Sequence, residues 1–237
     1  MLAAALGIIT VAAAAQAVTG FGFAMLAVPL LATVMPVNAA VVVGSLASLA
    51  MSVGTAIRER AHVHWRTSFV IFAIAVIGMP LGLYLLVSLP AAALTALVGI
   101  AVLGSTWLVW RRPTLPEGPA TIGAIGFLVG VLTTSTGTNG PPLVAAFQSF
   151  GYDKRAFRAT IASTFVCCGI VSVGFFAYGH EISATVIETC LVGIPGGFAG
   201  WWAGDRFFRR LNAAAFRVVV LIALTAAALL TLIRALI

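Results

Sequence analysis

Charged residues are scarce in this sequence. Asp, Glu, Lys and Arg together make up 8% of the 237 residues, whereas an ordinary soluble domain carries about 25%. Hydrophobic residues make up 62%, and the mean hydropathy is +1.14. So few charges cannot cover the surface of a water-soluble protein of this size. The composition therefore excludes a soluble fold and indicates that the lipid bilayer is the solvent of this chain.

Cysteine and histidine are also scarce, with three of each. The cysteines lie inside apolar segments without metal-ligand spacing, and His62, His64 and His180 are expected in loops. This pattern predicts no metal site and no cofactor. Glu188 is the deepest carboxylate expected in the membrane, and no His or Lys lies there to act as a base. We therefore do not expect an enzyme.

Apolar runs of roughly 18 to 24 residues follow one another along the chain, and each is about long enough to cross 30 Å of hydrocarbon as a helix. The sequence therefore predicts an all-α polytopic membrane protein. In the first half we expect a segment over 1–34, interrupted by glycine near 19–22, and helices over 38–57, 67–88 and 91–110. In the second half we expect a segment over 120–150, interrupted near 135–141, and helices over 157–178, 183–204 and 213–236.

The two halves resemble each other when the chain is shifted by 117 or 118 positions. The segment 19–22 then falls on 136–139, Gln16 on Thr133, and Ser45 on Ser163. A constant offset of this kind is the signature of internal duplication. We therefore divide the chain into a first membrane repeat over 1–110, a cytoplasmic linker over 111–119, and a second repeat over 120–237.

The basic residues predict the orientation of these repeats. They lie in short clusters between apolar runs, as expected for cytoplasmic loops rather than for a nucleic-acid surface. If each broken segment is a re-entrant hairpin, twelve of the 13 basic residues face the cytoplasm, and only Arg234 does not. A hairpin followed by three crossings inverts the second repeat relative to the first. Two short full crossings are the alternative. They place the basic clusters on both sides of the membrane, which the positive-inside rule disfavours.

In such a fold the substrate site is expected where the two broken segments meet near the midplane. Glycine lets a ligand approach the backbone, and helix N-termini flanked by hydroxyl groups suit an anion. Ser45 and Ser163 enter the prediction because the repeat pairs them. The predicted substrate-binding residues are Gln16, Thr19, Gly20, Gly22, Ser45, Thr133, Ser135, Thr136, Gly137, Thr138, Asn139, Gly140 and Ser163. For Gly78, Gly82, Gly196, Gly197 and Gly200 we instead expect close helix packing.

Several segments resemble the sulfite exporter TauE/SafE family. They are the runs 20–31, 40–46 and 63–65 in the first half, and 137–143 and 159–163 in the second. The resemblance covers essentially the whole chain. It implies a multi-pass transporter of the bacterial inner membrane that moves sulfite or small organosulfonates such as sulfoacetate, in the outward direction.

The leading hypothesis is therefore a secondary transporter that binds a small sulfur oxyanion between the two Gly-rich breaks. An anion channel, a membrane-embedded enzyme and a scaffold subunit are the alternatives. The expected partners are a small anionic substrate and the lipid bilayer, with no nucleic acid. A homodimer stays open as the oligomeric state.

Overall fold

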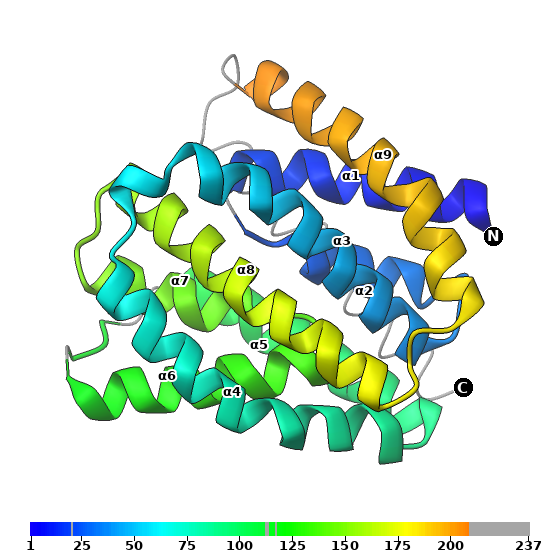
Figure 1. Cartoon of the computed structure of the whole chain (residues 1–237), viewed down its shortest axis with the longest axis horizontal. Coiled ribbons are helices and arrows are strands. Elements are labelled where there is room, and N and C mark those ends of the chain that lie inside the picture. Colours follow the sequence, from blue (N-terminus) through cyan, green and yellow to red (C-terminus); the bar gives the residue numbers. More distant parts are fainter. Residues whose placement is uncertain (20, 112–113, 117, 209–237) are drawn as a thin grey trace.

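The computed structural model describes residues 1–19, 21–111, 114–116 and 118–208, and every regular element in this part of the chain is a helix (Figure 1). The predicted helix over 213–236 lies outside the described residues. The helices of the first half are α1 (Leu2–Thr19), α2 (Phe23–Leu31), α3 (Val37–Arg58), the 3-10 turn η1 (Arg60–His62), α4 (Trp65–Ser88) and α5 (Ala91–Arg111). Those of the second half are α6 (Pro119–Ser135), α7 (Gly140–Ser149), α8 (Lys154–Tyr178) and α9 (Ala184–Phe208).

Within the described residues, these boundaries confirm the predicted helices and the positions of the two predicted breaks. The first broken segment consists of α1 and α2, and the second consists of α6 and α7. Four described helices are long and apolar enough to cross a membrane: α3, α4, α5 (over Ala91–Leu108) and α8 (over Arg155–Tyr178). The described chain is thus a helical polytopic membrane protein.

Large apolar side chains cover much of the outer surface. Ile77 and Phe69 on α4 are 68% and 66% exposed, and Trp107 and Trp110 near the end of α5 are more than half exposed. In water such a surface would drive aggregation, whereas in a bilayer these apolar side chains contact apolar lipid tails. The tryptophans near helix ends fit the interfacial belt of a membrane protein.

α4 packs against α6 through glycines on both helices. A Cβ at Gly78 or Gly82 would collide with the main-chain oxygen of Phe127 or Val131 on α6. In the other direction, a Cβ at Gly130 would collide with the main chain of Ala75 on α4. Small residues let helix backbones approach this closely in membranes. The packing role predicted for Gly78 and Gly82 is confirmed.

α1 packs against α9 in the same manner. A Cβ at Gly200 would collide with the main chain of Thr10, and a Cβ at Gly196 would collide with the side chain of Leu6. The packing role predicted for these two glycines is therefore also confirmed. The long first helix of each broken segment thus packs against a helix from the other half of the chain. Figure 1 shows α9 lying across α1.

α3 and α8 pack against each other between these two pairs. At one end, the loop that joins α3 to α4 contacts the segment that joins α7 to α8. The His64 N–H donates to Thr160 Oγ1 at 3.1 Å, and the Tyr152 hydroxyl donates to Thr67 Oγ1 at 3.0 Å. The His64 and Tyr152 rings stack with their centroids 4.2 Å apart. The α3–α4 loop and the α7–α8 segment, each next to a cluster of basic residues, therefore lie on the same side of the molecule.

The glycine contacts predict the cost of a single methyl group. Gly130→Ala should lower the stability of the folded protein by about 1–3 kcal/mol, because the added Cβ meets only main-chain atoms, which cannot move aside as a flexible side chain would. The measurement is the thermal unfolding midpoint in detergent. Gly123→Ala on the same helix is the control, since no atom lies within 4 Å of its Cβ position. Equal midpoints for the two variants would contradict this role of Gly130.

Candidate functional site

The second break turns the chain sharply between α6 and α7. α6 ends at Ser135, Thr136 leaves the helical conformation, and Gly137 has a φ of +69°. A Cβ at Gly137 would lie 3.1 Å from the Ser45 hydroxyl oxygen. Glycine meets both demands, because it adopts positive φ without strain and allows close approach. α7 then begins at Gly140 with prolines in its first turn.

The first break contributes a helix start without a side-chain cap. α2 begins at Phe23, after Gly22 with a φ of +95°, and no described side chain caps it. Leu26 N–H donates to the Gly22 oxygen at 3.3 Å, so the helical hydrogen bonds begin only there. The N–H groups of the first turn have no acceptor within the helix. They give this end of α2 a partial positive charge.

The two breaks meet inside the molecule. The Cβ position of Gly140 lies 3.5 Å from Phe21 Cβ, and that of Gly137 lies 3.6 Å from Ala24 Cβ. The Phe165 ring on α8 approaches from another side, with its Cζ atom 3.3 Å from the Gly140 Cβ position. Each break is therefore covered by protein rather than by lipid.

Two small adjoining cavities open where the breaks meet. Both cavities are lined by Ser48, Gly137, Asn139 and Phe165. The larger is lined in addition by Ser45, Leu49, Thr133, Gly169 and Ser172. The smaller is lined in addition by Gly22, Phe23, Ala24, Met25, Thr138 and Gly140. No described lining residue has an ionisable side chain, so the described walls of the cavities are polar and uncharged.

The hydroxyl groups of the second break are largely occupied by their own backbone. Thr133 and Ser135 donate to the main-chain oxygens four residues earlier, at 2.6 and 2.7 Å. The Thr136 and Thr138 hydroxyls bond each other at 2.7 Å, and Asn139 donates to Thr133 Oγ1 at 2.9 Å. These bonds satisfy polar groups that the break would otherwise leave unpaired. They also leave few of these hydroxyls free to donate to a ligand.

The predicted substrate-binding residues fall into two groups, those that line a cavity and those that do not. For two further residues the structure does not describe the side chain or the position. Those that line a cavity are Gly22, Ser45, Thr133, Gly137, Thr138, Asn139 and Gly140. Those that line neither cavity are Gln16, Ser135, Thr136 and Ser163. Gly20 and the side chain of Thr19 lie outside the described residues.

Ser45 and Ser163, which the repeat pairs, share an unusual property. Their hydroxyl oxygens are both buried without a hydrogen-bond partner. Gln16 is similar, since its amide nitrogen donates to Ser52 Oγ at 3.3 Å while its oxygen lacks a partner. A buried polar group without a partner is costly, which suits a group that bonds a ligand. Of these three residues, only Ser45 lines a cavity.

Sequence reasoning missed Ser48, Phe165 and Ser172. Ser48 follows Ser45 by three residues on α3, which places both hydroxyls on one side of that helix. This spacing was the available signal. Phe165 and Ser172 gave no comparable signal, because an aromatic ring and a single serine on an apolar helix are common packing residues.

The described residues contain no group of three or more His, Cys, Asp or Glu that could hold a metal ion. Glu188 on α9 is exposed. The polar character of the cavities therefore comes from hydroxyl, amide and main-chain groups.

A model of the sulfite exporter TauE/SafE family matches residues 5–231. The chain belongs to this family. As a TauE/SafE protein it is a multi-pass protein of the inner membrane, in agreement with its apolar surface and its spanning helices. The family resemblance noted in the sequence is thereby confirmed.

Two curated relatives are similar to this chain along most of their length. The probable inner membrane transporter protein TsaS of Comamonas testosteroni is 28% identical over 176 residues, which are 70% of this chain and 72% of the relative. The probable sulfite/organosulfonate exporter TauE of Cupriavidus necator is 27% identical over 201 residues, which are 81% of this chain and 78% of the relative. Both names describe transport rather than catalysis. No solved structure matches the chain significantly.

The left-handed turn at Gly137 gives a test of the site geometry. Gly137→Ala should destabilise the protein by about 1–2 kcal/mol through its positive φ, and further through contact with Ser45. Gly151→Ala is the matched control, since Gly151 has a φ of +67° and no atom within 4 Å of its Cβ position. Thermal unfolding in detergent measures both. Adding Ser45→Ala should recover part of the Gly137→Ala loss, and no recovery would contradict the contact.

Proposed function

We propose that this protein exports a small sulfur oxyanion, sulfite or a short organosulfonate such as sulfoacetate, and binds it in the cavities between the two breaks. The observation that carries the proposal is the meeting of two broken helices at a polar, uncharged cavity with the unpartnered Ser45 hydroxyl in its wall. The family and the names of the relatives support the substrate class.

The chemistry of the cavity suits an anion. Residues 22–25 at the start of α2 line the smaller cavity, Ser48 lines both cavities, and Ser45 lines the larger one. Main-chain N–H groups at a helix start and hydroxyl groups bind oxyanions without a fixed positive charge. Among the described residues, no carboxylate lines the cavities to repel an anion.

The proposal includes two repeats of inverted topology, each a re-entrant hairpin followed by three crossings. The packing between the two halves supports it. The repeat relates α1 to α6 and α4 to α9, and α1 packs on α9 just as α6 packs on α4. The contact between the α3–α4 loop and the α7–α8 segment also supports it, because single crossings would place these loops on opposite sides of the membrane.

The membrane potential supplies a driving force for export. An inside-negative potential favours the exit of a singly charged anion by about 2.3 kcal/mol per 100 mV. Outward movement therefore needs no coupling ion, which agrees with cavity walls that lack ionisable groups. The anion binds inside, crosses the neutral cavity and leaves outside.

The hairpin topology predicts the accessibility of introduced cysteines. In a variant with Cys167, Cys168 and Cys190 replaced by alanine, Arg60→Cys and Arg155→Cys should both react with a membrane-impermeant maleimide in inside-out vesicles. Neither should react in intact spheroplasts.

Ala91→Cys should react from the opposite side and serves as the control, because Ala91 begins α5, just beyond the far end of α4. Labelling of Arg60→Cys and Arg155→Cys from opposite sides would contradict the hairpins and favour single crossings.

The binding site is tested by flux into proteoliposomes. The wild-type protein should move sulfite faster than empty vesicles do, with saturation that a simple channel lacks. Ser45→Ala combined with Ser48→Ala should raise the KM for sulfite about tenfold, since a hydrogen bond to a charged group contributes about 1.5–3 kcal/mol.

Thr95→Ala is the control for that experiment. Thr95 lies on α5 outside both cavities and bonds only the Ala91 oxygen, so its KM should equal that of wild type. An unchanged KM in the double variant would refute the site, and wild-type flux equal to that of empty vesicles would refute the function.

A further inference from the structure

One face of α8 connects the cavities with a basic residue that the proposed site does not use. Phe165, Gly169 and Ser172 line the larger cavity and follow one another at helical spacing. Arg158 precedes Phe165 by seven residues, or two helical turns, and so lies on the same face about 10 Å nearer the start of the helix. Arg158 therefore lies on α8 between the start of this helix, where Lys154 and Arg155 lie, and the residues that line the cavities.

The Arg158 side chain is only partly exposed, and its Nε atom is buried without a hydrogen-bond partner. No ion pair joins it to any acid among the described residues. A buried N–H group of a guanidinium is costly to leave unpaired. Two other arginines have aromatic partners: Arg58 lies 5.3 Å from the centre of the Trp201 ring, and Arg206 lies 4.8 Å from that of Trp202.

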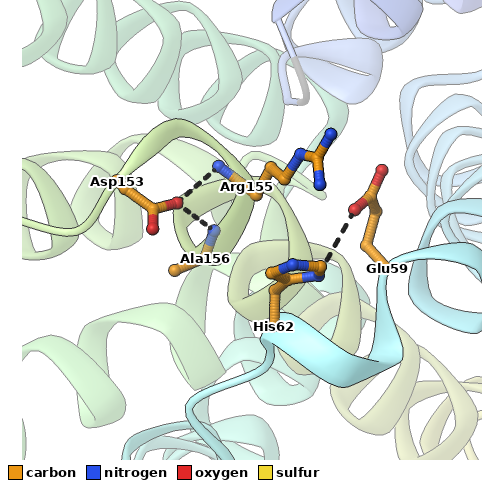
Figure 2. A network of polar contacts seen from close by, with 5 residues as sticks. All are labelled: Glu59, His62, Asp153, Arg155 and Ala156. Carbon is orange, nitrogen blue, oxygen red and sulfur yellow. Dashed lines mark hydrogen bonds and ion pairs between the residues drawn. The ribbon is translucent and has the colours of Figure 1, made fainter.

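Two described acids at this end of the molecule, Asp153 and Glu59, already have other partners (Figure 2). Asp153 Oδ1 accepts the N–H groups of Arg155 and Ala156, each at 2.8 Å, and the Ala156 bond is the main cause that holds the pKa of Asp153 below its usual value. Glu59 lies 3.7 Å from the His62 ring nitrogen. Neither carboxylate is paired with Arg158.

Arg158 lies in the second turn of α8, near the positive end of the dipole of that helix. The groups that face this end from neighbouring elements are His62, His64 and Glu59 on the α3–α4 loop. Such a location attracts a small anion. The corresponding position of the first half, 118 residues earlier, is Ala40, which carries no charge.

We propose that Arg158 is an anion-capture site, at which its guanidinium holds the oxyanion of the substrate before the anion passes Phe165 into the cavities. This inference rests on the proposed function. Phe165 lies between the two stages, because its ring is buried and lines both cavities. The shared ligand chemistry is an oxyanion, and a lipid phosphate is the other source that the experiment must distinguish.

The test compares initial sulfite flux in proteoliposomes of phosphatidylcholine for wild type, Arg158→Gln, Arg158→Lys and Arg155→Gln. Arg158→Gln should raise the KM for sulfite about tenfold and keep the maximal flux within about twofold, because it removes a charge-assisted hydrogen bond. Arg158→Lys should recover part of this loss. Arg155→Gln removes the same charge from an exposed position of the same helix and should keep the wild-type KM.

Each contrary result has a distinct meaning. A wild-type KM in Arg158→Gln, with active wild-type protein, overturns the capture site alone. Wild-type flux equal to that of empty vesicles overturns the proposed function instead. If Arg158→Gln fails to fold, Arg158→Lys decides, and an unchanged KM overturns the capture site because the lysine lacks the Nε donor.

The lipid alternative has its own measurement. Phosphatidylglycerol is added to the purified wild-type and Arg158→Gln proteins in detergent, and the thermal unfolding midpoint is recorded. The capture site predicts the same shift for both proteins. A shift that occurs only in the wild type, together with an unchanged KM in the variant, identifies a lipid phosphate as the ligand and overturns the capture site.

Discussion

The main-chain hydrogen bond is the interaction on which the rest of this structure depends. Hydrocarbon offers no partner to a free N–H or carbonyl group, so an irregular segment is tolerated only where protein or a water-filled cavity covers it. Both breaks of this chain meet that condition by lying against each other and against α3 and α8. The hydroxyls of Thr133, Ser135 and Thr136 supply further partners to the main chain. A polar cavity inside an apolar protein is a direct result.

The positions of the helices were predictable because lipid imposes both the composition and the length of a crossing segment. The breaks were predictable because Gly22 and Gly137 need a positive φ that other residues avoid. The direction of individual side chains was less predictable. The sequence shows the Thr and Ser residues of 133–138, but whether a hydroxyl faces the cavity or its own backbone depends on helix rotation. Ser48 lines the cavities and Ser135 does not, although both are serines on apolar helices.

The separation of charge from the cavities also has a physical reason. A site that conducts an anion must bind it well enough to admit it and weakly enough to release it. A fixed cation in a low-dielectric cavity would hold the anion strongly. Hydroxyl and main-chain donors bind more weakly, so a cavity lined by Ser45, Ser48 and the start of α2 suits passage. The described basic residues instead lie at or near the ends of the helices, where water screens exposed charges.

The glycine contacts have a consequence for movement. α4 and α6 approach each other closely enough that main-chain atoms touch, and so do α1 and α9. Surfaces in such contact cannot slide past one another without separating, so each pair behaves as one rigid body. Each body contains one helix from each half of the sequence. A movement of one pair against the other would therefore cut across the two halves of the sequence, and it would change the contacts that α3 and α8 make, such as that of Leu49 with Gly169.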